Sequence, residues 1–321
     1  MSKNNLYTSN SEKLLLKENV KFFLKLLLFA CMVIAYLYHI MPQYEGNYVA
    51  SLVDKVERLE SIEEPKIVLL GNSNLTFGIQ SDLIESEIGM PVVNMGLHGG
   101  LGNAFHERMA GYNVTAGDIY ILCHSSFADD GSISDTTLAW VTLENHSKLW
   151  KLVHLSEMYS MLKGYPAYLK SCIALYNKNS NGIYDPGGVY ARSAFNSYGD
   201  ILVERKESEY TFTFTISPPP INDITVDRIN ELAAWLEAQG AILLVAGYPI
   251  GQGELTAPEE EFEEFQRELE NRLDCEVISQ YTDYMYDYHY FYNTDLHLNS
   301  EGAKIRTEQL IEDIKRWQTD V

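Results

Sequence analysis

The chain has 321 residues, of which 46% are hydrophobic, so it is long enough for one large α/β domain or two small ones. This composition excludes a wholly disordered protein, because it supplies enough apolar surface for a substantial core. Residues 43–321 carry 19 basic and 43 acidic residues, a net charge of −24. Such an acidic region should repel nucleic acid and anionic lipid headgroups, so we expect no nucleic-acid partner and favour neutral or cationic partners, such as uncharged glycans.

An apolar segment near the N-terminus is long enough to cross a bilayer as a helix. From Phe22 to Met41 there are 20 residues, nearly all of them apolar except Lys25 and His39. No small-residue cleavage site precedes Pro42, so the pattern predicts an uncleaved signal anchor over residues 22–42. Lysines in and before this segment place residues 1–21 in the cytoplasm and the remainder outside. The alternative is a buried helix of a soluble protein.

The four cysteines form no obvious framework. Cys31 lies in the apolar segment and Cys123 in a predicted buried strand, and no C-x-x-C spacing occurs. A disulfide between Cys172 and Cys275 is compatible with an extracytoplasmic location, whereas free thiols are the default expectation.

Strands and helices alternate along most of the chain after a charged connector over residues 43–64, which we expect to lift the domain off the membrane. Predicted strands cover residues 67–70, 91–95, 119–123, 241–246 and 275–278, and predicted helices cover residues 80–88, 103–113, 227–239, 258–273 and 301–317. This alternation predicts a mostly parallel sheet that is covered by helices on both faces.

The region from about 130 to 220 interrupts the alternation. It is rich in Tyr, Asn, Ser and Gly, and it ends at Pro218-Pro219-Pro220. A departure of this length inside a compact domain is typical of a functional insertion. We expect a helical hairpin over residues 136–176 and a short β segment over residues 210–215.

Polar residues that directly follow predicted strands are the first candidates for a site, because ligands of parallel sheets bind at the carboxyl ends of the strands. Ser73 follows the first strand, where neighbouring N–H groups at the start of a helix can stabilise an oxyanion. An N-cap role explains an isolated Ser73 equally well. Leu75 breaks the G-x-S-x-G nucleophile elbow of α/β-hydrolases.

A second candidate lies near the C-terminus, where Asp295 and His297 are two residues apart in a predicted loop. Helix packing does not explain that spacing. A serine, a histidine base and an orienting acid can be distant in sequence and adjacent in space, so Ser73, His297 and Asp295 form a candidate triad. The alternative is a structural His297 beside the helix-capping residues Asn299 and Ser300.

Together these segments resemble the SGNH hydrolase family, also called GDSL-type esterases, and in particular its membrane-anchored relatives in surface-polysaccharide acylation systems. Residues 67–73 are similar to the family's first block, with Asn72 in place of the usual Asp, and residues 93–96 are similar to the second block. The Asp295-x-His297 pair resembles the shortened terminal signature of alginate-type acetylation proteins. The resemblance covers about residues 65–315 and implies a flavodoxin-like three-layer α/β fold, here preceded by one transmembrane helix.

The resemblance also implies roles for individual residues. Ser73 matches the nucleophile, and the N–H groups of Ser73 and Gly96 match the oxyanion hole. The family's third block provides an asparagine that this chain lacks. Either Ser126 offers a hydroxyl in its place or the oxyanion hole is built differently. Further candidates for substrate binding are Asn74, Asn94, His98, His124 and Tyr292.

The expected function is therefore a membrane-anchored, extracytoplasmic serine O-acyltransferase or esterase that acts on acyl groups, with acetyl favoured, of a surface or exported polysaccharide, without a cofactor. A multipass membrane-bound O-acyltransferase is the partner that the resemblance implies. The alternative is a non-catalytic glycan-binding or assembly subunit of a polysaccharide-modification complex.

Other chemistries have weaker patterns. The histidines at 98, 106, 124 and 297 could converge on a metal, but Ala110 stands where H-E-x-x-H requires its second histidine, so we expect no metal site. The glycine-rich turn at residues 96–102 matches no nucleotide-binding motif. The tyrosines of residues 281–292 suit either a sugar-stacking rim or an ordinary strand.

Overall fold

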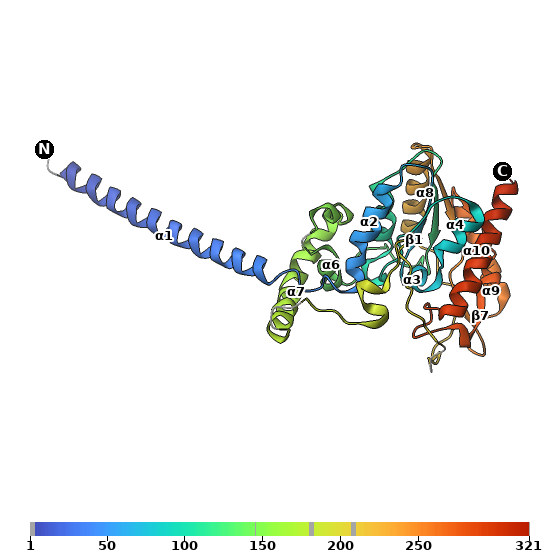
Figure 1. Cartoon of the computed structure of the whole chain (residues 1–321). Coiled ribbons are helices and arrows are strands. Elements are labelled where there is room, and N and C mark those ends of the chain that lie inside the picture. Colours follow the sequence, from blue (N-terminus) through green and yellow to red (C-terminus); the bar gives the residue numbers. More distant parts are fainter. Residues whose placement is uncertain (1–3, 145, 180–182, 207–209, 321) are drawn as a thin grey trace.

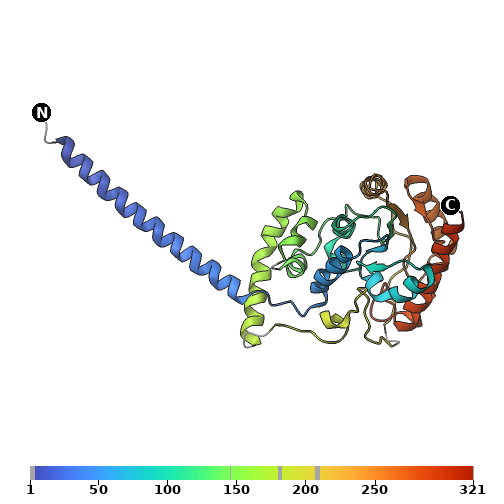
Figure 2. The same cartoon turned by 45° about the horizontal axis from the view of Figure 1, so that its top comes forward.

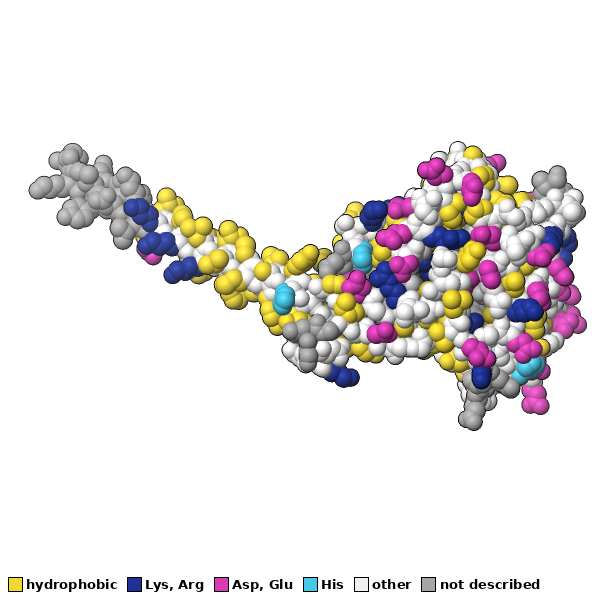
Figure 3. Space-filling view, in the orientation of Figure 1, with side chains coloured by type: hydrophobic (Ala, Val, Ile, Leu, Met, Phe, Trp, Pro, Cys, Tyr) yellow, Lys and Arg dark blue, Asp and Glu magenta, His cyan; other side chains and the backbone are white. Residues whose placement is uncertain are grey.

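A computed structural model describes residues 4–144, 146–179, 183–206 and 210–320. The first helix, α1 (Asn4–Ile40), extends away from the rest of the molecule (Figure 1). Its stretch Leu15–Ile40 is long and apolar enough to cross a membrane, and its side chains are almost all exposed, many of them hydrophobic (Figure 3). This stretch agrees with the expected spanning segment, although it begins seven residues before Phe22.

The domain is built on a five-stranded parallel sheet with the order β2-β1-β3-β4-β6. Its strands are β1 (Ile67–Gly71), β2 (Val92–Asn94), β3 (Ile119–Cys123), β4 (Ile242–Val245) and β6 (Glu276–Val277). In register, Leu69 pairs with Asn94 on one side and with Ile121 on the other. The predicted α/β class with a mostly parallel sheet is confirmed. The strand order reverses between β1 and β3, which is where doubly wound sheets open a crevice at their carboxyl edge.

Helices cover both faces of the sheet because successive strand residues point to opposite sides. Val68 and Leu70 belong to one apolar core, and Ile67 and Leu69 belong to the other. Three helices contribute buried residues to the first core: α2 (Leu52–Ser61), α5 (Asn103–Arg108) and α8 (Asp223–Glu237). Two helices contribute to the second core: α4 (Ser81–Ile88) and α10 (Ser300–Asp320). Helix α3 (Ser73–Gly78) follows β1, and α9 (Glu259–Arg272) packs beside β6.

The prediction of a spacer over residues 43–64 is wrong for most of this segment, because α2 packs in the core of the domain. Leu52 and Leu59 of this helix are completely buried, and its periodic apolar face packs in the same core as β1 and β3.

The middle region contains the expected hairpin, formed by α6 (Thr136–Leu143) and α7 (Met158–Lys178). Figures 1 and 2 place this hairpin between the end of α1 and the sheet. Residues 210–215 form no strand, contrary to the prediction, and a single β-bridge follows at Ile216. A second, two-stranded sheet pairs β5 (Ile250–Gln252) with β7 (Met285–Asp287), so little of the tyrosine-rich segment is strand.

Short connections complete the fold. The 3-10 helices cover Tyr48–Ser51, Gly99–Leu101, Met109–Tyr112, Ser147–Leu152, Leu155–Glu157, Gly188–Tyr190, Arg192–Ala194, Tyr281–Tyr284 and Tyr288–Tyr290. All four cysteines are free thiols, so Cys172 and Cys275 do not form the disulfide that the sequence left open.

Candidate active site

Ser73 is the first residue of α3, directly beyond the carboxyl end of β1. The helix is capped by Asn72, whose Oδ1 accepts a hydrogen bond from the N–H of Asn74 at 3.0 Å. Capping by Asn72 decides between the two interpretations of Ser73: its hydroxyl is not the N-cap acceptor and is available for another partner.

Buried contacts hold the turn that carries Ser73. The Asn74 amide donates to Asn72 Oδ1 at 2.7 Å and to the Cys123 carbonyl at 2.9 Å. Arg306 of α10, which is completely buried, donates to the Asn74 carbonyl and to its Oδ1 at 2.7 and 2.8 Å. Asn74 is itself completely buried, so it shapes the turn. The predicted contact of Asn74 with substrate is wrong.

His297 lies against Ser73, with 2.8 Å between Nε2 and the serine Oγ. Its ring stacks on Phe77, with 3.9 Å between ring centroids and 4° between planes, and the residue is 9% exposed. Burial, together with the positive charges of His98 and Arg205, lowers the pKa of His297 to about 3. The imidazole is therefore neutral near pH 7 and able to accept a proton.

Asn293, not Asp295, is the side chain that orients His297. Its Oδ1 lies 2.7 Å from Nδ1, and its amide nitrogen donates to the Tyr190 hydroxyl at 2.7 Å. An amide oxygen can only accept, so Nδ1 carries the hydrogen and the lone pair of Nε2 faces Ser73. The predicted Asp295 contact is wrong, and the third member of this arrangement is neutral.

A tight turn explains the change of partner. The Thr294 Oγ1 accepts hydrogen bonds from the N–H groups of Leu296 and His297, at 3.2 and 3.1 Å. The chain folds back on itself, so that Tyr292 N–H donates to the His297 carbonyl. This turn brings the residue four positions before His297, and not the one two before it, to the ring nitrogen.

Asp295 lines a small cavity beside the site. The cavity has a volume of about 130 Å³, and its lining includes Ser125, Tyr248, Asp295 and Leu296. Burial raises the pKa of the Asp295 carboxyl. A larger hollow of about 450 Å³ lies at the start of β4 and is lined in part by Ile242 and Glu276. Neither cavity is lined by Ser73 or His297.

Two backbone N–H groups at the serine turn can donate hydrogen bonds to an oxygen that develops negative charge. Within the described ranges, the N–H groups of Ser73 and Gly99 have no hydrogen-bond partner. Gly99 is exposed and adjoins the serine turn, since a Cβ built on it would lie 3.7 Å from Asn72 Cβ. Donors fixed before the reaction stabilise an oxyanion without reorganisation.

Gly96, the expected second donor, is already occupied. Its N–H donates to Asn94 Oδ1 at 2.9 Å, and a Cβ built on it would lie 2.7 Å from Leu75 Cβ. The prediction for Gly96 is therefore wrong, and this glycine allows the segment after β2 to pack closely against α3.

In the loop after β3, Ser125 contacts the serine turn and Ser126 does not. The Ser125 Oγ accepts from Asn72 Nδ2 at 2.8 Å. The Ser126 Oγ instead accepts from Ala128 N–H at 3.3 Å, and its carbonyl accepts from Asn103. Ser126 therefore makes its described hydrogen bonds with other residues than those of the serine turn, while its O–H proton stays available. Its role as an oxyanion donor stays a prediction.

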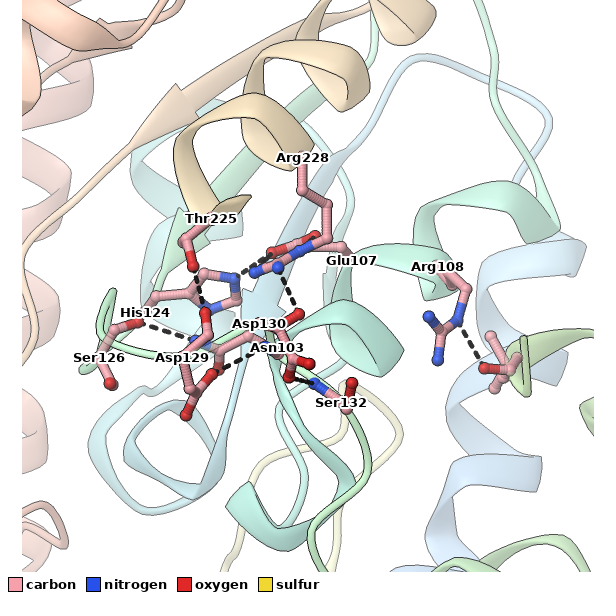
Figure 4. A network of polar contacts seen from close by, with 12 residues as sticks. Asn103, Glu107, Arg108, His124, Ser126, Asp129, Asp130, Ser132, Thr225 and Arg228 are labelled. Carbon is pink, nitrogen blue, oxygen red and sulfur yellow. Dashed lines mark hydrogen bonds and ion pairs between the residues drawn. The ribbon is translucent and has the colours of Figure 1, made fainter. Parts of the chain in front are cut away.

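A buried ionic network holds this loop in place (Figure 4). Glu107 lies 2.8 Å from His124 Nε2 and accepts from Arg228 at 2.5 and 3.2 Å. Arg228 also donates to the Asp130 carbonyl, and Thr225 donates to the Asp129 carbonyl. His124 is completely buried, so it supports the loop from below and does not reach substrate, contrary to our expectation.

The remaining substrate-binding predictions divide by exposure. Asn94 is completely buried and donates to Asp200 and to the Leu75 carbonyl, so its predicted contact with substrate is wrong. His98 is exposed, with Nδ1 accepting from Gly100 N–H. Tyr292 is half-buried and stacks on the same Phe77 ring as His297. His98 and Tyr292 therefore remain available at the edge of the site.

Three functional candidates escaped the sequence analysis: Asn293, Ser125 and Gly99. Asn-Thr at 293–294 is a turn-forming pair, and this signal could have suggested that the loop folds back before His297. Nothing local distinguishes Gly99 from Gly96, or Ser125 from Ser126, because the distinction depends on which N–H or hydroxyl is already bonded.

Comparisons with protein-family models, curated proteins and solved structures found no match. In the part of the chain that the structure describes, no group of three or more His, Cys, Asp or Glu side chains is arranged to hold a metal ion.

Proposed function

We propose that the protein is a membrane-anchored serine acyl-transfer enzyme, an esterase or O-acyltransferase of a surface polysaccharide. The observation that carries the proposal is the relay from Ser73 Oγ to His297 Nε2 at 2.8 Å and from His297 Nδ1 to Asn293 Oδ1 at 2.7 Å. Nucleophile, base and orienting group are the parts that covalent acyl transfer requires.

The first half of the proposed reaction acylates the serine. Ser73 Oγ attacks the acyl carbonyl carbon while His297 Nε2 takes the hydroxyl proton, and the tetrahedral oxyanion accepts hydrogen bonds from the N–H groups of Ser73 and Gly99. The intermediate then collapses. The bond to the leaving oxygen breaks, His297 returns its proton to that oxygen, and an acyl ester remains on Ser73.

The second half removes the acyl group. A water molecule or a sugar hydroxyl attacks the ester carbonyl and gives its proton to His297, which then protonates Ser73 as the ester bond breaks. Asn293 fixes the tautomer and orientation of the ring throughout. It carries no charge, so it stabilises the imidazolium less than a carboxylate would.

The preference for an acetyl group rests on the family resemblance, because the cavity of about 130 Å³ is lined by Ser125 and Asp295 but not by Ser73 or His297. The glycan would approach over the edge of the site that carries the exposed His98 and the half-buried Tyr292. The apolar Leu15–Ile40 stretch of α1 and the preceding lysines support anchoring with the domain outside the cytoplasm. A multipass membrane acyltransferase as donor of the acyl group rests on the family resemblance alone.

The proposal is tested with the full chain in detergent, treated with a fluorophosphonate probe and assayed with p-nitrophenyl acetate. We expect labelling and turnover in the wild type and in Ser86→Ala, which changes an exposed serine of α4. Both should be lost in Ser73→Ala and in His297→Ala. Wild-type labelling or turnover in either of these two variants would overturn the assignment.

A second candidate function is a non-catalytic glycan-binding subunit. The amide of Asn293 at the position of the orienting group favours it, because a neutral amide stabilises the imidazolium less than a carboxylate would. Under this alternative the probe leaves wild-type Ser73 unlabelled, while the wild type and Ser73→Ala bind the glycan equally well. Labelled Ser73 excludes it.

A further inference from the structure

Helix α7 has a charge opposite to that of the region around it. Its 21 residues include Lys163, Lys170 and Lys178 and no Asp or Glu. Residues 43–321 as a whole carry a net charge of −24. Helix α7 is therefore a local exception to the acidic charge of this region.

The exposed side of α7 is also apolar. Leu155, Tyr159 and Leu162 are 83%, 68% and 63% exposed. Leu155 lies just before α7, and the spacing of four and three residues places all three side chains on one side of the helix. Lys163 lies on the same side, with its Nζ 4.3 Å from the centroid of the Tyr159 ring. Exposed apolar side chains flanked by lysines are typical of helices that lie in a membrane interface.

The opposite side of α7 is occupied by the hairpin. Met161, Tyr168 and Cys172 are buried there, and α7 packs along α6. The packing fixes the rotation of α7 about its own axis, and so fixes which side chains face outward.

Helix α7 lies directly at the end of the membrane-spanning stretch. The Tyr176 hydroxyl lies 3.2 Å from His39 Nε2, and the Tyr168 hydroxyl is 3.2 Å from Met41 Sδ. Glu144 accepts hydrogen bonds from the N–H groups of Gln43 and Tyr44, which ties the chain to the hairpin as it leaves α1. Figures 1 and 2 both show α7 crossing the end of α1, between that helix and the sheet.

We propose that α7 rests on the bilayer surface, with Leu155, Tyr159 and Leu162 in the interface and its lysines on anionic phospholipid headgroups. Tyrosine suits this depth, and lysine can extend its ammonium group to the headgroups while its stem stays in the apolar layer. The inference rests on α1 crossing the membrane and is independent of the proposed chemistry at Ser73. Together, α1 and α7 would hold the domain in one orientation relative to the membrane.

The test uses the full chain in nanodiscs, with an environment-sensitive fluorophore on Leu162→Cys in a Cys31→Ser, Cys275→Ala background. The matched control carries the fluorophore on Ile224→Cys, an exposed position of α8. In nanodiscs that contain phosphatidylglycerol, we expect a blue-shifted emission at position 162 that lipid-borne quenchers reduce, and neither effect at position 224. Because attraction between charged surfaces is screened by salt, high salt should weaken both effects.

The charge contribution is tested separately with Lys163→Gln, Lys170→Gln and Lys178→Gln combined. We expect the signal at position 162 to fall toward its value in phosphatidylcholine nanodiscs, while incorporation through α1 is unchanged. A water-like emission at position 162 in anionic nanodiscs would overturn the proposal. So would a blue shift that appears only when another membrane protein is added, because α7 would then be a protein-binding surface.

Discussion

Two buried histidines, His124 directly after β3 and His297 in the loop before α10, have opposite surroundings. His124 bonds to Glu107, and that carboxylate is also held by Arg228. Burial opposes ionisation of Glu107, but its contacts with His124 and Arg228 prevail and lower its pKa. His297 lies between a hydroxyl and an amide oxygen, at Ser73 and Asn293.

The difference separates a structural histidine from a candidate base. The His124 contact lies inside a network of opposite charges, and no serine hydroxyl is bonded to its ring in the described structure, so its bonds fix a loop. The His297 ring is neutral and bonds on both sides to neutral groups, one of which can give up a proton. The sequence predicts that the histidine of the site has a carboxylate as its partner. In the structure, the histidine with a carboxylate partner is His124, which is structural.

The largest expected effect comes from removing each histidine in turn. We expect His297→Ala to lower kcat/KM by about 10⁴-fold or more while leaving the melting temperature nearly unchanged. His124→Ala should instead lower the melting temperature and reduce activity much less. Turnover of p-nitrophenyl acetate and thermal melts of both variants measure the contrast, and equal losses of activity would remove it.

Gly99 allows a backbone donor to be deleted without deleting a side chain. It begins a 3-10 helix, where proline is tolerated, and the preceding His98 has φ −63° and ψ 132°, which suits a residue before proline. Gly99→Pro removes the N–H and should lower kcat about 10²–10³-fold.

The control for this variant is Gly99→Ala. Its Cβ would meet only ordinary contacts and the N–H is retained, so its kcat should stay near the wild-type value. If the two variants lose the same activity, Gly99 acts through its conformation and not as a donor.

The stability of the His124 network is tested with Glu107→Gln. Loss of the carboxylate leaves the Arg228 guanidinium without its buried ionic partner, at a cost of about 3–5 kcal/mol. For a domain of this size the melting temperature should fall by roughly 10 °C.

Asp54→Asn is the comparison for Glu107→Gln. Asp54 is 49% exposed where it pairs with Arg192, and such surface pairs contribute about 0–1 kcal/mol. A similar shift in both variants would show that the Glu107 network contributes no more than a surface ion pair.

The smallest expected effect is a displacement of the pH profile. Because the pKa of His297 is lowered to about 3, the neutral base persists as the pH falls, and kcat/KM should decline only well below pH 6.5. Asn293→Asp places a carboxylate against Nδ1, which stabilises the imidazolium and raises this pKa. The acid limb of the profile should then move to higher pH. Asp295→Asn should leave the limb in place, and a shift in that variant would restore Asp295 as the partner of His297.

Much of the fold could be predicted because strand and helix periods dominate its sequence. Alternating apolar strands and amphipathic helices gave the parallel sheet, and the strand ends located Ser73. The sequence predicts a spacer in place of α2 because the charged residues of this helix mask its narrow apolar face. One of these charges, Lys55, is buried, with its Nζ donating to the carbonyls of Asn94 and Gly199. A buried lysine whose partners are distant carbonyls leaves no local pattern.

The site was less predictable than the sheet because it depends on single hydrogen bonds. The Thr294 hydroxyl stabilises the turn before His297, which makes Asn293 and not Asp295 the partner of the His297 ring. The Asn94 side chain accepts the hydrogen bond of the Gly96 N–H. Such exchanges change neither composition nor periodicity, so sequence patterns do not report them.

Arg306 makes the order of synthesis matter for the proposed nucleophile. The turn that presents Ser73 is held by a guanidinium supplied by the final helix, and His297 also comes from the last part of the chain. While the protein is still emerging from the ribosome, the serine has neither its base nor the group that holds its turn. On the proposed chemistry, a nascent or truncated chain that lacks His297 and α10 carries an inert serine.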